Sequence, residues 1–277
     1  MWFLAALLSA LFYALLWIFA RMSRGIPVSV VVMIQHAFGP VLLLFAARTV
    51  DFPWGETWFR WYLLLPFVIL PISLWSITYA LHRTEVTIVK PLFGLSSIAT
   101  LLIAVGFFGE SVTEWGILGI LVITLGLFCL YHGRWESWKR SGPWIALCVS
   151  IVFGVNVAIL SKVLSRFPHI LAISGLVMTS VFFLSSFVAI PALSRVSSTK
   201  RNISLLAAMA LSVVAMDLFT LYAITLGPSS YVVSVKRTSV LMVAIMGYVF
   251  LRERDQSLMR LLIASGLVVL GVVFLTV

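Results

Sequence analysis

Residues 2–20, WFLAALLSALFYALLWIFA, carry no charge and are long enough to cross a bilayer as an α-helix, which takes about 20 apolar residues. The rest of the chain has the same character, because 62% of its 277 residues are hydrophobic and only 10% are charged. A soluble domain carries about 25% charged residues, and no soluble core could hide this much apolar surface. The sequence therefore predicts an all-α integral membrane protein.

Ten segments of this kind are separated by turn or charge signals, such as RMSRGIP at residues 21–27 and RERDQ at residues 252–256. None of the connecting segments is long enough to fold as a separate domain. The expected transmembrane helices are residues 2–20, 28–47, 60–80, 86–108, 113–131, 143–164, 168–193, 202–226, 229–251 and 257–277.

The chain also repeats internally. Residues 9–24 align without a gap on residues 150–165, and residues 78–110 align on residues 221–253 at a shift of 143. The second alignment pairs Ser96 with Ser239 and Glu110 with Glu253. The matches are weak one by one, but they run in the same order along both halves.

Each half then holds five helices, and an odd number makes the second half enter the membrane from the opposite side. We predict two inverted repeats, residues 1–134 and 143–277, joined by a connecting loop at residues 135–142. In transporters built this way, the substrate site lies near the bilayer midplane between the repeats.

Loop charges predict the orientation. The loops after the first, third, fifth, seventh and ninth spans hold eleven Lys and Arg residues, whereas the other loops hold four. Because cytoplasmic loops carry the excess of Lys and Arg, we expect both termini on the non-cytoplasmic side of a plasma (inner) membrane. The net charge of +10 then reflects topology, and we expect no nucleic-acid partner.

Four charged residues lie inside predicted spans: Lys90, Asp217, Lys236 and Arg237. A charge near the bilayer centre costs at least about 2.5 kcal/mol, so each needs a physical reason. Lys90 lies about one turn into its span and could extend its ammonium to the membrane interface. The last three lie at similar depth on either side of the turn at residues 227–228, where Asp217 could form a structural ion pair with the two cations. Alternatively, the surplus of positive charge binds an anionic substrate, for which Arg supplies a bidentate fork and Lys a point charge.

Other polar and aromatic residues of the spans are weaker candidates. An interhelical hydrogen bond is the simpler role for His36 and Asn156, although His36 could carry a proton. Glu110 and Glu253 end two of the spans and are interpreted as repeat-related caps or gate contacts. The aromatic residues that could wall a substrate cavity are Trp17, Tyr79 and Tyr222.

Two segments carry a family resemblance: TEVTIVKPLFGLSSIATLLIAVGFFGESVT at residues 84–113 and LGPSSYVVSVKRTSVLMVAIMGYVFLRERD at residues 226–255. Each is a helix of small and apolar residues that ends in a large apolar run and Glu. The whole chain resembles the drug/metabolite transporter superfamily, of the ten-helix EamA type. That resemblance implies ten helices in two repeats and a transport function.

A narrower likeness is to the sugar-phosphate (triose-phosphate) translocator branch. SVKRTSV at residues 234–240 is similar to the segment whose Lys-Arg pair binds the substrate phosphate in that branch. Lys90 in IVKPLF and Lys162 in NVAILSK match further lysines of that branch. The resemblance implies that Lys162, Lys236 and Arg237 bind an anionic group.

The leading hypothesis is a secondary transporter that moves a small organic metabolite, anionic or phosphorylated, by alternating access. One alternative is an exporter of amino acids or other neutral or zwitterionic metabolites. Another is a flippase for a phosphate-bearing substrate, which could be lipid-linked. The chain shows no HExxH, GxSxG or Walker motif, so we expect no enzyme, no metal and no cofactor. Expected partners are the substrate and membrane lipid, with a homodimer as a possible assembly.

Overall fold

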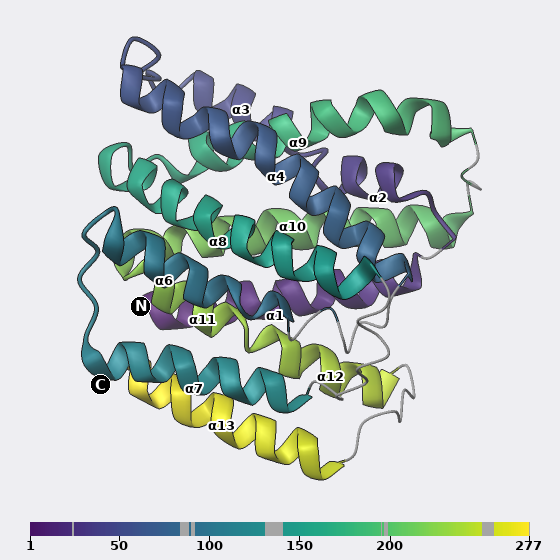
Figure 1. The fold of residues 1–277 in the computed structure, drawn as a ribbon. Helices are drawn as coiled ribbons and strands as arrows, with labels where there is room; N and C mark the ends of the chain where they lie inside the picture. Colours follow the sequence, from purple (N-terminus) through teal and green to yellow (C-terminus); the bar gives the residue numbers. More distant parts are fainter. Residues whose placement is uncertain are drawn as a thin grey trace.

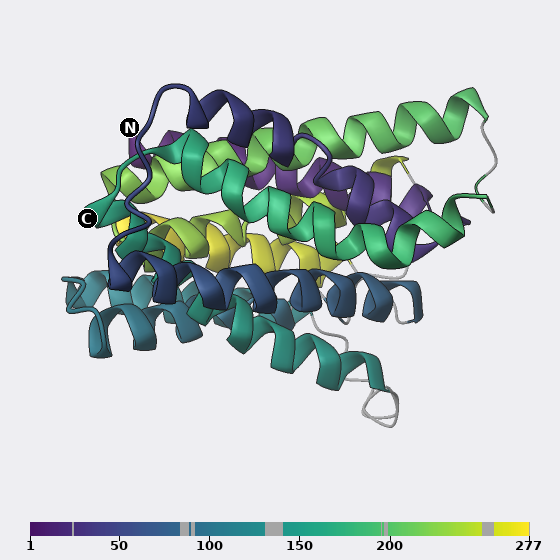
Figure 2. The same ribbon diagram turned by 90° about the horizontal axis from the view of Figure 1, so that it is seen from above.

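The computed structural model describes residues 1–23, 25–83, 89, 92–130, 141–194, 196, 199–250 and 258–276. These residues form a bundle of α-helices that run roughly side by side in two perpendicular views, and both ends of the chain lie at the same end of the bundle (Figures 1 and 2). Within these ranges there is no β-strand. In lipid, a helix is favoured because it satisfies its own backbone N–H and C=O groups.

The helices follow the predicted spans closely, and six are long and apolar enough to cross a membrane: α1, α2 with α3, α4, α8, α9 and α10. The fourth predicted span is described at Val89 and from residue 92 onwards. The helix bounds are α1 (Trp2–Met22), α2 (Val28–Gln35), α3 (Gly39–Ala47), α4 (Thr57–Arg83), α6 (Ser96–Gly106), α7 (Glu114–Leu130), α8 (Ser141–Arg166), α9 (Ile170–Leu193), α10 (Lys200–Leu226), α11 (Ser229–Lys236), α12 (Ser239–Phe250) and α13 (Leu258–Thr276).

Three of the predicted spans are interrupted, which the sequence analysis did not foresee. The second span breaks at residues 36–38 between α2 and α3, the fourth at residues 94–95 before α6, and the ninth at residues 237–238 between α11 and α12. The interruptions in the fourth and ninth spans fall at equivalent positions of the two repeats, because residues 94–95 plus 143 are residues 237–238.

The hydrogen bonds at these two interruptions repeat as well. The N–H of Leu95 donates to the carbonyl of Leu92 at 3.1 Å, and 143 residues later Thr238 donates to Val235 at 2.9 Å. Such bonds from residue i to residue i−3 tighten the helix locally and often mark a functional hinge. The repeat seen in the sequence is therefore present in the backbone.

The packing of the helices follows the same symmetry. Each span of the first half corresponds to the fifth span after it, so that α1 corresponds to α8, α4 to α10 and α7 to α13. Helix α1 packs against α10, and its repeat partner α8 packs against α4, the partner of α10. Likewise α1 packs against α11 and α12, as α8 does against α6. Three further pairs map onto themselves: α2 and α3 with α9, α6 with α11, and α7 with α13. The pair of α7 and α13 lies along one side of the bundle (Figure 1).

Gly154 allows the close contact of α8 with α6. A Cβ atom at this position would lie 2.6 Å from both the carbonyl oxygen of Ser96 and the Cβ of Ala99, which real Cβ atoms do not approach. The glycine therefore lets the middle of α8, with its neighbour Phe153, pack directly on the interrupted fourth span.

The junction between the halves falls on residues 131–140, which lie outside the described residues. Helix α8 begins at Ser141, two residues before the second repeat was expected to begin. The boundaries at residues 134 and 143 stay a prediction.

Candidate functional site

The interruption of the ninth span places two cations inside the protein. Lys236 is the last residue of α11 and Arg237 the first residue of the break, and their side chains are only 4% and 1% exposed. The last carbonyl groups of a helix carry partial negative charge, so the end of α11 is a favourable place for a cation. Eight residues of α11 and twelve of α12 flank the break, so both cations lie near the middle of the span.

The guanidinium of Arg237 packs against two phenylalanine rings. Its Cζ atom lies 4.5 Å from the ring centre of Phe93 and 5.7 Å from that of Phe153. The two ring centres are themselves 5.2 Å apart, so both rings lie on the same side of the guanidinium. The guanidinium also donates a hydrogen bond to the Tyr13 hydroxyl.

One edge of the Arg237 guanidinium has no hydrogen-bond partner among the described residues. The two nitrogens of this edge, Nε and Nη2, are both buried. They form the edge that binds carboxylate and phosphate oxygens with two parallel hydrogen bonds. The donors of this edge therefore match the geometry of an oxyanion.

Lys236 has a neutral partner. Its Nζ atom donates a 2.9 Å hydrogen bond to Oγ1 of Thr220 on α10 and lies 5.1 Å from the ring centre of Tyr13 on α1. The same Thr220 hydroxyl is 2.7 Å from the hydroxyl of Ser9. The ammonium is thus held where α1, α10 and α11 meet.

Asp217 does not form the ion pair that was one of the two expectations. Its Oδ2 atom accepts a 3.1 Å hydrogen bond from Ser174, and among the described residues it makes no salt bridge with Lys236 or Arg237. The ammonium of Lys236 donates its hydrogen bond to Thr220, one helical turn beyond Asp217. The carboxylate of Asp217 is still near enough to attract the ammonium electrostatically. The described site therefore holds two buried cations and one half-buried acid.

Two more of the predicted residues lie beside this site. Trp17 is 8% exposed and packs edge-on against Tyr13, with ring centres 5.5 Å apart. Asn156 is 4% exposed, and its Oδ1 atom has no hydrogen-bond partner among the described residues. It follows Phe153 by three residues, so the two side chains share one face of α8.

Lys162 and His36 have no contact with the two cations among those that the structure describes. Lys162 is half-buried and lies nine residues after Phe153, which is about 13 Å further along α8. The Nδ1 atom of His36 lies 2.9 Å from the carbonyl oxygen of Val32, at the break between α2 and α3. Lys90 lies outside the described residues.

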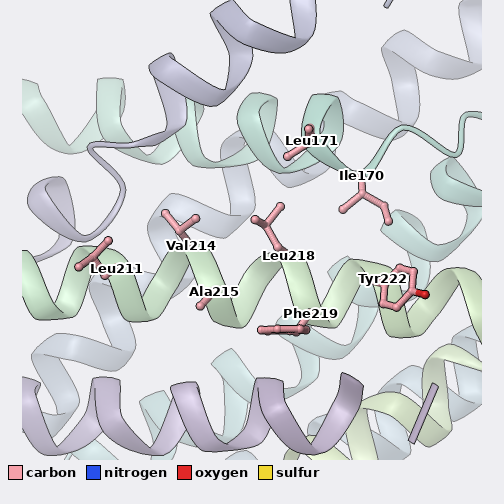
Figure 3. Close-up of a pocket in the computed structure, with 8 residues that line it drawn as sticks. All are labelled: Ile170, Leu171, Leu211, Val214, Ala215, Leu218, Phe219 and Tyr222. Atoms are coloured by element: carbon pink, nitrogen blue, oxygen red, sulfur yellow. The ribbon is translucent and has the colours of Figure 1, made fainter. Parts of the chain in front are cut away.

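The two predicted tyrosines are more exposed than the cations. Tyr79 is 36% exposed and Tyr222 is 45% exposed, and their role as walls of a substrate cavity stays a prediction. Tyr222 belongs to an apolar groove of about 590 Å³ between α9 and α10. In Figure 3, Leu211, Val214 and Leu218 point from α10 toward α9, whereas Phe219 points toward α1, where it stacks on Phe12.

The sequence analysis missed four residues that complete the site: Tyr13, Phe93, Phe153 and Thr220. Tyr13 could have been found, because it precedes Trp17 by four residues and so shares its helix face. No sequence signal marks the others, because aromatic residues and threonines are common throughout the spans.

Glu110 caps the ninth span from the other repeat. Its carboxylate accepts hydrogen bonds from the Ser229 hydroxyl at 2.7 Å and from the Ser230 hydroxyl at 3.1 Å and N–H at 3.3 Å. A carboxylate at the start of a helix satisfies free N–H groups and the positive end of the helix dipole. Its repeat counterpart, Glu253, lies outside the described residues.

A bundle of two inverted helical repeats, with a helix break that holds buried cations between them, is the architecture of a membrane transporter. The sequence matches the EamA-like transporter family over residues 1–132 and 140–277, and the chain belongs to that family. This membership confirms the ten-helix, two-repeat membrane fold and the drug/metabolite transporter resemblance.

Solved structures agree on the fold. Twenty-eight chains of solved structures match this one. One of them, described only as "Crystal structure of protein", superposes with a TM-score of 0.77 at 17% sequence identity and covers 99% of this chain and 96% of its own. No curated protein matches the sequence.

Proposed function

We propose that this protein is a secondary transporter for a small organic anion, a carboxylate or a phosphate, which binds to the edge of Arg237 formed by Nε and Nη2. The observation that supports the proposal is the pair of buried, unpartnered donors, Nε and Nη2. Burying a charged donor without a partner is costly, and an anionic substrate would supply that partner during each transport cycle.

The two repeats would share the substrate. Tyr13 and Phe93 come from the first repeat, and Phe153, Thr220, Lys236 and Arg237 come from the second. If the halves rock against each other around this site, the anion becomes accessible from one side and then from the other. The breaks at residues 94–95 and 237–238 are the natural hinges, because their helices already depart from regular geometry.

The test is anion uptake into proteoliposomes by the purified protein and its variants. Arg237→Gln should abolish uptake, because an amide cannot replace the charged bidentate edge, and Arg237→Lys should restore little of it. Arg48→Gln, at an exposed position outside the site, is the matched control. Normal uptake by a correctly folded Arg237→Gln protein would contradict the proposal.

A second candidate, a flippase for a phosphate-bearing lipid, is favoured by the groove between α9 and α10, which is lined by apolar side chains. The groove would hold the lipid tail while the cations hold the headgroup. A flippase would move labelled lipid between leaflets of protein-containing vesicles, whereas the transporter would move only the water-soluble anion.

We also propose that both termini lie on the non-cytoplasmic side, from the excess of positive charge in the opposite loops. The Glu110 contact with α11 would then belong to the non-cytoplasmic end of the transporter.

A further inference from the structure

We propose that Asn156 selects the substrate, by accepting a hydrogen bond from a donor that the anion carries next to its charged group. The transported molecule is then a small anion with a hydroxyl or ammonium group one or two carbons from its carboxylate or phosphate. This inference rests on the proposed function, because it places the charged group on Arg237.

The first observation is that Asn156 has no partner of its own. Its side chain is 4% exposed, and within the described residues its buried Oδ1 atom makes no hydrogen bond. A carboxamide offers one strong acceptor and two donors, and nearly all such buried groups are paired in folded proteins. We infer that the unpaired Oδ1 atom of Asn156 accepts a hydrogen bond from the substrate when the substrate is bound.

The second observation is that Asn156 shares a helix face with Phe153, which lies against Arg237. Phe153, whose ring centre lies 5.7 Å from the Arg237 Cζ atom, precedes Asn156 by three residues on the same face of α8. Side chains at this spacing have Cβ atoms about 5–6 Å apart. A molecule whose carboxylate or phosphate sits on the Arg237 edge therefore needs only a few further atoms to reach Asn156.

The third observation concerns the hydroxyl groups at the breaks. Many buried hydroxyls of this bundle donate to a carbonyl of their own helix, as those of Ser150 and Ser212 do. Four hydroxyl oxygens that are themselves fully buried have no partner among the described residues. Three of the four lie at or beside the two repeat-related breaks: Ser97, Thr238 and Ser239.

The fourth unpartnered hydroxyl, Thr179, lies apart from these in α9. A substrate with an apolar body would leave Asn156 and the three hydroxyls at the breaks unpaired when it displaced water from them. A substrate that carries a hydroxyl or ammonium group would form hydrogen bonds with these groups. The chemistry around Arg237 therefore favours a polar anion over an apolar anion of the same size.

The experiment compares anions that differ only in the donor, using the purified full-length protein in detergent. Lactate is compared with propionate, and glycerol phosphate with propyl phosphate, by calorimetric titration. Wild-type protein should bind the donor-bearing member of each pair about tenfold more tightly, the upper range for one hydrogen bond. Asn156→Leu, which keeps the size but removes the acceptor, should abolish this difference.

The outcomes separate the two proposals. If no anion binds to wild-type protein, the proposed function fails. If anions bind but wild-type protein does not discriminate within the pairs, the function stands and the role of Asn156 is overturned. Equal weakening of lactate and propionate by Asn156→Leu would also overturn it, because Asn156 would then hold the charged group itself.

A control substitution and an alternative variant accompany Asn156→Leu. Asn202→Leu makes the same substitution at the start of α10, outside the site, and should leave the discrimination intact. If the Asn156→Leu protein does not fold, Asn156→Gln takes its place. This variant moves the acceptor outward by about one bond, so it should reduce the preference for lactate over propionate without affecting the binding of propionate. The wild-type comparison needs neither variant to fold.

Discussion

The Nζ atom of Lys236 donates a 2.9 Å hydrogen bond to Oγ1 of Thr220, and not to the carboxylate of Asp217 one turn earlier on α10. A neutral partner holds the ammonium in place without cancelling its charge. The neighbours of Arg237 among the described residues that carry its contacts are two aromatic rings and a tyrosine hydroxyl, none of which is an acid. This arrangement leaves the positive charge available to an anion.

Removing the hydroxyl that holds Lys236 should therefore destabilise the protein. We expect Thr220→Val, which keeps the shape of the side chain, to lower stability by about 1.5–3 kcal/mol, the value of a hydrogen bond to a charged group. Thermal unfolding in detergent measures the effect. Thr225→Val, at an exposed position of the same helix, should change little, and an equal effect at both positions would argue against a special role for Thr220.

Neutralising Asp217 should strengthen anion binding. The carboxylate lowers the positive potential at Lys236 without forming a salt bridge, so Asp217→Asn should raise anion affinity several-fold while the protein stays folded. Binding constants in detergent test this. If Asp217→Asn instead unfolds the protein and Lys236→Gln restores folding, the acid and the cation are a structural pair after all.

Filling the space at Gly154 should force α8 away from α6. We expect Gly154→Ala to cost about 1–3 kcal/mol, as overpacking of a tight contact does, because the new Cβ would lie 2.6 Å from the Ser96 carbonyl oxygen and from the Ala99 Cβ. Gly266→Ala in α13 is the matched control, since no atom lies within 4 Å of the new Cβ, and better helix propensity should leave its stability equal or higher. The thermal midpoint of unfolding should fall for Gly154→Ala and should stay equal or rise for Gly266→Ala.

Removing the cap of α11 should loosen the start of the ninth span. Glu110→Ala deletes three hydrogen bonds to Ser229 and Ser230 and should cost about 1 kcal/mol or somewhat more. Hydrogen exchange of the α11 amides in detergent should rise. Glu114→Ala, at the exposed first turn of α7, should leave the exchange of α11 unchanged.

The predicted orientation can be checked with fusions at the C-terminus. A reporter that is active only outside the cytoplasm should be active there, and one that is active only in the cytoplasm should be silent. The opposite pattern would reverse the assignment of all loops and place the Glu110 contact on the cytoplasmic side.

Membrane class, the ten spans and the two repeats were readable from the sequence. The reason is that the bilayer imposes one length and one composition on every crossing helix, and the shift of 143 aligned segments such as residues 78–110 and 221–253. The break at residues 237–238 was not readable, because neither residue is a glycine or a proline, whereas Gly94 and the pair at residues 39–40 are weak signals for the other two breaks. Buried Lys236 and Arg237 were found because a charge inside a span is rare.

The sequence by itself determined that this chain crosses a bilayer ten times in two inverted halves and carries cations at mid-depth in its ninth span. Only the tertiary structure decided that Lys236 pairs with Thr220, that two buried nitrogens of Arg237 lack a partner among the described residues, and that Tyr79 and Tyr222 are partly exposed. The physical reason is that a transmembrane helix is apolar on all sides. Its sequence shows no stripe that separates the lipid-facing side from the interior, so packing between distant helices selects the neighbours.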